Sequence, residues 1–269
     1  MLRRWCIPLA TLTLVIGSML AAGSAAATAH GSRTTGHLIR PTAQLVRPTG
    51  HGTVPLLGHV GSQTTVGSTN WSGYAATGAN GAFSSVSASW TEPTGHCSSG
   101  HQYSSFWVGL DGFSSGTVEQ TGSEVDCSGS TPVYYSWYEM YPAFPVNFSN
   151  TVRPGDHFDA SVTFNGGSSF TLVLSDTTQV WSHTISASLS GAARSSAEVI
   201  AEAPSSSGGV LPLANFGTVN FTASKANGMN LGSFNPTEII MVGNSGRPKV
   251  SVSALTGGTD FSVTWLRSR

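Results

Sequence analysis

The chain has 269 residues, of which 9% are charged, and its formal net charge at pH 7 is −1. It has no long basic run with interleaved aromatic residues, so the composition argues against a nucleic-acid partner. The residues beyond position 29 suffice for one domain of ordinary size with a buried core.

Residues 1–29 have the organisation of a secretory signal peptide. Two arginines precede an apolar run from Cys6 to Leu20, and small residues follow as far as Ala29, after which we expect cleavage. The run is shorter than the ~20 residues of a membrane-spanning helix, so a transmembrane anchor is the weaker alternative. The sequence therefore predicts a secreted, extracellular protein that has no membrane attachment once the signal is removed.

Residues 30–67 form a basic arm, which we interpret as a pro-segment of largely irregular structure. No acidic residue occurs from His30 to Thr65, whereas all 13 acidic residues and seven Lys and Arg follow from Val66 onward. This asymmetry suggests that the arm docks by charge on its own domain as an intramolecular inhibitor. A disordered linker is the alternative that the same Pro- and Gly-rich composition permits. The basic side chains of the arm are Arg33, Arg40, Arg47, His30, His37, His51 and His59.

From residue 68 onward, short runs rich in β-branched and aromatic residues predict strands separated by turns. Residues 193–202 carry the best helical pattern, but their central residues could equally form a strand. Many short strands in about 200 residues indicate an all-β sandwich or barrel, so residues 68–269 are predicted to form one domain. The predicted strands are 84–90, 134–141, 157–164, 169–176, 181–189, 218–224, 238–243, 249–255 and 260–266.

Cys97 and Cys127 are predicted to form a disulfide. Cys6 belongs to the signal peptide, which leaves an even pair in an oxidising compartment. Although His96 and His101 lie close to Cys97, no second Cys or His pair has the spacing of a zinc ligand set. We therefore expect neither a metal nor another cofactor.

Two sequence patterns of hydrolases are present but incomplete. Residues 112–116 satisfy G-x-S-x-G, yet that elbow requires a strand-to-helix turn of an α/β sheet, which this chain does not predict. Asp111-Gly112 lacks the Ser or Thr of the loop in pepsin-like enzymes. A glycosidase pair of Glu139 with Glu198 or Glu202 remains possible. A secreted carbohydrate-binding or glycan-cleaving β-sandwich is thus the alternative function, with tryptophans and tyrosines available to stack on sugars.

Six segments occur in the order and at about the spacing found in the glutamic peptidases, or eqolisins, and on these segments the sequence resembles that family. The resemblance implies a secreted, acid-acting endopeptidase that cleaves polypeptides. It also implies an antiparallel, concanavalin A-like (lectin-like) β-sandwich of two sheets. We further expect a monomer. The segments are NWSGY (70–74), FWVGLDG (106–112), VEQTG (118–122), WYEMYP (137–142), AEVIAEAP (197–204) and LANFGTVNF (213–221).

The resemblance also implies the site residues. The catalytic glutamine of the family falls on Gln120, and its catalytic glutamate falls on Glu202, the second acid of the 197–204 segment. Glu198 lies four residues earlier and would share a strand face with Glu202, so a structural role and a role in tuning the pKa of Glu202 both stay open. Positions that line or support the cleft fall on Trp71, Trp107, Asp111, Trp137 and Glu139.

An amide paired with a carboxylate suits peptide hydrolysis in acid. Glu202 would take a proton from the attacking water and return it to the leaving nitrogen, while Gln120 would donate an N–H to the oxyanion and orient the water through its carbonyl oxygen. Histidine is held protonated in acid and cannot act as a base there. A glutamate with a reference pKa near ~4.3 still titrates in that range, and an amide does not titrate.

Overall fold

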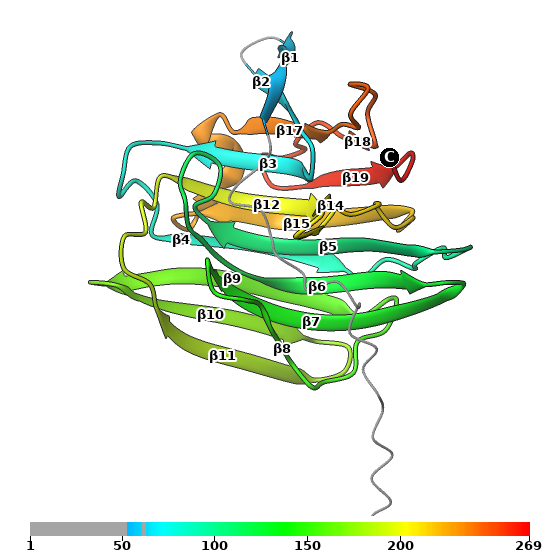
Figure 1. Ribbon diagram of the computed structural model, residues 1–269. Helices are drawn as coiled ribbons and strands as arrows, with labels where there is room; N and C mark the ends of the chain where they lie inside the picture. Colours follow the sequence, from blue (N-terminus) through cyan, green and yellow to red (C-terminus); the bar gives the residue numbers. More distant parts are fainter. Residues whose placement is uncertain (1–52, 61–62) are drawn as a thin grey trace, which may run out of the picture. The chain divides into compact units, whose positions relative to one another are not determined.

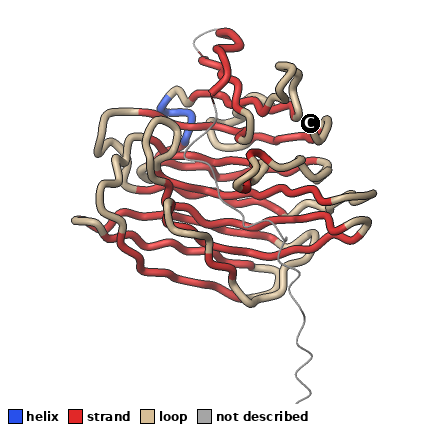
Figure 2. Tube along the Cα trace, in the orientation of Figure 1, coloured by secondary structure: helices blue, strands red, loops and turns tan. Residues whose placement is uncertain are grey.

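The computed structural model describes residues 53–60 and 63–269 (Figures 1 and 2). The predicted signal peptide and residues 30–52 of the predicted pro-segment lie outside the described residues. Within the described residues, strands make up nearly all of the regular structure, together with one 3-10 helix, η1 (Leu231–Phe234). No helix in the described part of the chain is long and apolar enough to cross a bilayer.

The strands form two large sheets. One has nine strands in the order β1-β2-β17-β3-β12-β5-β6-β7-β8, and all neighbours pair antiparallel except β2 and β17, which are parallel. Its strands are β1 (Thr53–Val60), β2 (Gln63–Ser68), β17 (Thr237–Met241), β3 (Trp71–Thr77), β12 (Ser196–Glu202), β5 (His101–Leu110), β6 (Val118–Ser128), β7 (Thr131–Tyr141) and β8 (Val146–Asn147).

The second sheet has eight strands in the order β11-β10-β9-β4-β15-β19-β18, with β16 paired to β15. A separate pair, β13 (Ser205–Ser206) and β14 (Gly209–Val210), forms a small hairpin. The strands of the second sheet are β11 (Trp181–Ser188), β10 (Ser169–Asp176), β9 (His157–Gly166), β4 (Ser85–Thr91), β15 (Thr218–Ala226), β19 (Phe261–Trp265), β18 (Val250–Val252) and β16 (Met229–Asn230).

The main core lies between the two sheets, which confirms the predicted all-β sandwich. Val199 on β12 and Phe106 on β5 belong to the same apolar cluster as Trp90 and Phe158 of the eight-stranded sheet. A second apolar cluster contains residues of the nine-stranded sheet alone and lies on the opposite face of that sheet, because its members alternate along the strands with those of the main core. We call this opposite face the site face. The second cluster consists of Trp71, Ala75, Trp107, Val118, Trp137, Ile200 and Ile239.

The nine runs predicted as strands all coincide with strands, apart from a few residues at their ends, and residues 196–202 of the ambiguous segment form β12. Strands β3, β5 and β6 carry no alternating pattern and were not predicted. The described part of the predicted pro-segment is not irregular, since β1 and β2 occupy 53–60 and 63–68 and β2 pairs with β17. The Thr and Val residues of β2 favour this extended structure. Where the chain is processed stays a prediction.

The predicted disulfide is confirmed. Cys97 and Cys127 are joined with an S–S distance of 1.99 Å. The bond links the segment that follows β4 to the end of β6. It thereby closes a loop that contains β5 and the part of β6 in which Gln120 lies.

Candidate active site

Strand pairing arranges the site face in rows of residues that lie side by side across β12, β5, β6 and β7. The first row contains Glu198, Gly109, Gln120 and Glu139, and we call it the Gln120 row. The next row contains Ile200, Trp107, Gly122 and Trp137, and the third, the Glu202 row, contains Glu202, Ser105, Glu124 and Tyr135. Trp71 on β3 pairs with Glu202 and extends the third row.

The Gln120 side chain is buried and is held by a carboxyl group. Its Nε2 donates a hydrogen bond of 2.5 Å to Oε2 of Glu139, the residue paired with it on β7. Its Oε1 is buried and accepts no hydrogen bond from the described residues. Gly109 on the other side leaves room for the amide, because a Cβ there would lie 3.1 Å from the Cβ of Gln120 and 3.0 Å from Cζ3 of Trp107.

The Glu202 carboxyl is held by two donors. Trp107 donates its indole N–H to Oε2 at 2.9 Å, and Asn70 donates its Nδ2 to Oε1 at 3.4 Å. Trp107 is itself packed edge-on against Trp71, with ring centroids 4.9 Å apart. Asn70 was not among the predicted site residues, although it opens the NWSGY segment that carried the resemblance. Asn70 directly precedes Trp71, which was a predicted site residue and pairs with Glu202, so its place in the sequence was a signal for a role in the site.

Gln120 and Glu202 occupy the same face of the sheet but not the same row. Their strands, β6 and β12, are separated by β5, and their rows are two apart. The register therefore sets their backbones diagonally, about 9–10 Å apart across the strands and about 13 Å along them. Trp107 lies in the row between them and contacts Glu202. Of the two glutamates on β12, Glu198 is the one that shares a row with Gln120.

Asp111 supports the site from the end of β5. It adopts a positive φ of 68° and accepts hydrogen bonds from the backbone N–H groups of Arg194 at 2.6 Å and Ser195 at 2.9 Å. The Thr117 hydroxyl donates to the same carboxyl at 3.5 Å. Asp111 thus ties the loop before β6, which carries Gln120, to the turn before β12, which carries Glu198 and Glu202.

Burial shifts the pKa of several carboxyl groups near the site. Burial raises the pKa of Glu198 well above its ordinary value, and the neighbouring Asp111 and Glu119 carboxyls add to the shift. The pKa of Glu119 is raised to about 8, again first by burial and then by Asp111. Because it alternates with Gln120 along β6, Glu119 points to the other face of the sheet. A raised pKa means that these groups carry a proton across the acid range.

The other predicted patterns are resolved by their location. The G-x-S-x-G segment at 112–116 lies between strands β5 and β6, without the helix that a serine elbow requires. Within residues 64–269, no group of three His, Cys, Asp or Glu side chains gathers in a way that could hold a metal ion. The absence of a cofactor stays a prediction.

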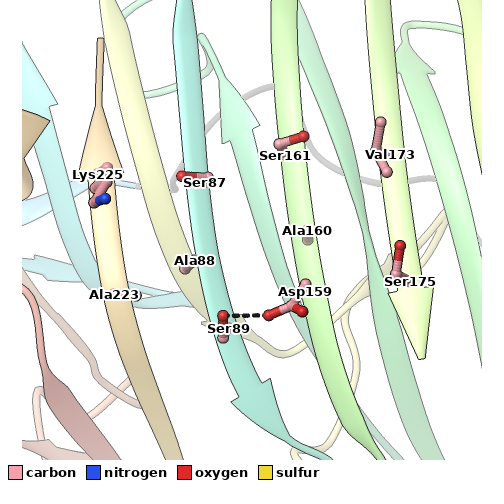
Figure 3. A pocket seen from close by; sticks show the side chains of 10 residues that line it. All are labelled: Ser87, Ala88, Ser89, Asp159, Ala160, Ser161, Val173, Ser175, Ala223 and Lys225. Carbon is pink, nitrogen blue, oxygen red and sulfur yellow. Dashed lines mark hydrogen bonds between the residues drawn. The ribbon is translucent and has the colours of Figure 1, made fainter. Parts of the chain in front are cut away.

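A shallow depression lies on the eight-stranded sheet, away from the predicted site residues. Figure 3 shows it over β4, β9, β10 and β15, where Ser89 donates a hydrogen bond of 2.5 Å to Asp159. Its lining consists mostly of Ser and Ala with Val173 and Lys225, and it includes no aromatic side chain. It therefore offers neither the predicted catalytic residues nor a stacking surface for sugars.

Comparisons with known proteins show similarity to peptidases. The model of the peptidase A4 family matches residues 69–265. Aspergillopepsin-2 of Aspergillus niger is 33% identical over 127 residues, which are 45% of this chain and 45% of that protein, so the match spans less than half of the relative's length.

Among solved structures, scytalido-glutamic peptidase with a transition-state analog inhibitor is 27% identical with a TM-score of 0.64, over 74% of this chain and 98% of that one. Aspergilloglutamic peptidase from Aspergillus niger is 26% identical with a TM-score of 0.55, over 61% and 99%.

Proposed function

This chain belongs to the peptidase A4 family, and on that premise we propose that it is a secreted endopeptidase of the glutamic type, which hydrolyses peptide bonds in acid. The observation that carries the proposal is the content of the site face. An amide and carboxyl groups, which come from three strands, lie there among three buried tryptophans. The two residues on which the chemistry depends are Gln120 and Glu202.

Glu202 is proposed as the base and then the acid of the reaction. The donors from Trp107 and Asn70 favour the carboxylate form and fix its orientation, since hydrogen bonds to an ionised group are strong and directional. The carboxylate removes a proton from the water that attacks the scissile carbonyl. It then delivers that proton to the nitrogen as the C–N bond breaks.

Gln120 is proposed to stabilise the oxyanion. Its NH₂ group has two hydrogens, of which one is directed to Glu139 and the other stays available for the developing negative charge. The diagonal separation of Gln120 and Glu202 leaves the space in which a water molecule and the scissile peptide group would lie. The tryptophans of the intervening row provide an apolar floor that excludes other water.

The two proposed catalytic side chains are buried, which fits synthesis as a zymogen. Gln120 and Glu202 are each 2% exposed, although they lie on a sheet face turned away from the second sheet. Substrate must therefore wait for a rearrangement or a cleavage. We propose that residues 30–67 act as the inhibitor, because their arginines complement the acidic side chains of the site face.

Lower pH is expected to release the pro-segment. Carboxyl groups on the site face lose charge as pH falls, so their attraction to Arg33, Arg40 and Arg47 weakens. The dissociation constant of the separately expressed pro-segment from the mature domain, measured from pH 7 to pH 3, should rise. Tighter binding at low pH would contradict the charge-based docking.

The decisive test of the function is digestion of an unfolded protein substrate at acid pH by the activated wild type and by Gln120→Ala and Glu202→Ala. Each substitution should lower kcat by at least ~10²-fold, because each removes a general base or an oxyanion donor. Asp159→Asn, an exposed acid of the other sheet, serves as the matched control and should leave kcat unchanged. Retention of the fold is checked by circular dichroism, and hydrolysis that survives either site substitution refutes the pair.

The carbohydrate alternative gains no support from the site. Trp107 and Trp137 are fully buried, and the indole N–H of Trp107 is already engaged with Glu202. A glycan array that gives tight binding, together with no proteolysis at any pH, would favour the alternative. The monomeric state and the secretion of the protein remain predictions.

A further inference from the structure

We propose that Glu198 is a positioning residue of this peptidase, which as an uncharged carboxylic acid donates a hydrogen bond to Oε1 of Gln120, directly or through one water molecule. The inference rests on the proposed function, because it assigns Glu198 a role toward the amide that is proposed to stabilise the oxyanion. It differs from a role in tuning Glu202, which lies two rows away.

The register places Glu198 beside Gln120. The two residues occupy one row, separated by Gly109 of β5, so their backbones are about 9–10 Å apart. Because Gly109 has no side chain, two long side chains can approach each other from opposite sides of β5. A Cβ on Gly109 would lie 3.0 Å from Cζ3 of Trp107 and 3.1 Å from Cβ of Gln120, so the Trp107 ring and the Gln120 side chain both lie close to this gap.

The two groups complement each other chemically. Oε1 of Gln120 is a buried acceptor that receives no hydrogen bond from the described residues, and both oxygens of Glu198 are buried in the same condition. The Ser196 hydroxyl and the Phe113 N–H lower the pKa of Glu198 against the larger rise caused by burial, although no described residue makes a hydrogen bond of standard geometry to either carboxyl oxygen. Buried polar groups are nearly always hydrogen-bonded, so a donor on Glu198 and an acceptor on Gln120 satisfy each other's requirement.

The surroundings of Glu198 keep its proton in place. The residue is 0% exposed and pairs with Ala75 and Gly109, and the carboxyl groups of Asp111 after β5 and Glu119 on the other face of β6 raise its pKa further. Glu139 on β7 lies at the far end of the row, and Glu202 lies two rows along β12. The nearby cation is Arg194, whose field acts on Glu119. Burial and like charge together disfavour the ionised form of Glu198.

For catalysis, the two contacts would hold the Gln120 amide in one orientation. Glu139 accepts from Nε2, and Glu198 donates to Oε1, so a flip of the Gln120 amide would break both contacts. Oε1 has two lone pairs, of which one receives the Glu198 proton and the other can still orient the attacking water. The second hydrogen of Nε2 then points at the site of the oxyanion in every turnover.

Two variants of Glu198 separate this role from others. Glu198→Gln keeps an N–H donor and should retain kcat within about threefold, whereas Glu198→Met keeps the length without a donor and should lower kcat about tenfold, which corresponds to ~1.4 kcal/mol and to the worth of one hydrogen bond. KM should change little in both. A role in tuning Glu202 through charge predicts instead that the two variants behave alike, since both are uncharged.

The pH profile supplies a second readout that a purely structural role would not move. In the wild type, ionisation of Glu198 should contribute to the loss of kcat on the alkaline side, and Glu198→Gln should shift that limb to higher pH. Glu92→Gln is the matched control, because Glu92 is equally buried and its pKa is also raised, but it hydrogen-bonds Ser123 away from the Gln120 row. Glu92→Gln should leave both kcat and the alkaline side of the pH profile unchanged.

The outcomes distinguish this inference from the proposed function. Absence of acid proteolysis in the activated wild type would end the proposed function. An active wild type whose Glu198→Met variant keeps full kcat, or whose Glu198→Gln variant is as impaired as Glu198→Met, would end this inference alone. If Glu198→Met does not fold, the shift of the alkaline limb in Glu198→Gln decides the matter, and an unshifted limb overturns the role.

Discussion

At the scale of single residues, the site is built around an amide whose neighbours in its row are a glycine and two carboxyl groups. Gln120 donates to Glu139 within the β6–β7 pairing, and Gly109 keeps the opposite side free of a side chain. In the proposed mechanism, the oxyanion donor is therefore a group that does not titrate at low pH. Charge changes are left to the carboxyl groups around it.

Gly109 is the position at which one added methyl group should lower both the stability of the fold and kcat. In Gly109→Ala the new Cβ would lie 3.0 Å from Trp107, 3.1 Å from Gln120 and 3.2 Å from the Glu119 carbonyl oxygen, so these groups must shift by a few tenths of an ångström. We expect a loss of about 1–3 kcal/mol in the free energy of unfolding. We also expect a fall in kcat of about 10- to 100-fold, because misplaced catalytic groups are costly.

Two further glycines provide the comparison for that experiment. Gly116→Ala has nothing within 4 Å of the new Cβ and should change neither kcat nor stability. Gly122→Ala would place its Cβ 2.1 Å from the carbonyl oxygen of Phe106 and should destabilise the fold strongly. Denaturant unfolding and acid proteolysis are measured on all three variants. Full activity in Gly109→Ala would contradict the packing described for the Gln120 row.

At the scale of elements, the strands that carry the site are buried on both faces. Every residue of β12 is buried, and so are nearly all residues of β6. One face packs in the main core and the other forms the site face, so side chains of acids and amides lie where a strand of an ordinary sandwich would expose them. Asp111 connects the loop before β6 to the turn before β12 and so couples the two strands.

The disulfide is the covalent restraint on this region. Cys97 and Cys127 are 30 residues apart, and the loop that they close includes β5 and Gln120. The double variant Cys97→Ser/Cys127→Ser should lose about 3–4 kcal/mol of stability, because the unfolded chain regains loop entropy. Guanidinium unfolding with and without a phosphine reductant measures the loss.

The reductant should destabilise the wild type and leave the double variant unaffected. Equal unfolding midpoints of wild type and double variant would show that the bond does not restrain the fold.

At the scale of the whole molecule, most of the acidic residues are inside. Ten of the 13 acidic side chains are buried, and several cannot ionise without cost. The pKa values of Glu92 and Glu119 are raised by burial to about 8, and that of Glu198 is raised well above its ordinary value. The fold is therefore adapted to conditions in which carboxyl groups carry their protons.

Stability should consequently fall as pH rises. Below the pKa of the unfolded chain, near ~4.5, these carboxyls are protonated in both states and the folded protein keeps its full stability. Between about 4.5 and 8 the unfolded chain releases protons that the folded protein retains, so each such group costs up to about 1.4 kcal/mol per pH unit. The loss is complete above the folded pKa.

Urea unfolding at pH 4, 6 and 8, at constant ionic strength, tests the sign of this dependence. The midpoint should decrease steadily from pH 4 to pH 8. The decrease should be smaller in Glu92→Gln, where one buried carboxyl can no longer ionise. A midpoint that is constant or rises over this range would refute the assignment of raised pKa values.

Sequence alone determined the strands of the eight-stranded sheet except β16, the disulfide and the family. Buried residues alternate with half-buried ones along β10, and half-buried residues alternate with exposed ones along β11. One face of each strand meets the core and the other meets solvent, and such an alternation can be recognised in the sequence. The family resemblance was recognised from the order and spacing of the six segments alone. Strands β3, β5 and β6 were not predicted because they are buried almost throughout and so lack the alternation of buried and exposed residues.

Tertiary structure alone decided which side chains meet. The contact of Gln120 with Glu139 follows from the tight turn between β6 and β7, which sets their register locally. The row that joins Glu198 to Gln120 and the contact of Trp107 with Glu202 depend instead on the pairing of β12 with β5, strands about 90 residues apart in the chain. Register between distant strands is set by packing of the whole sandwich, since a shift of one residue would turn every site residue into the core.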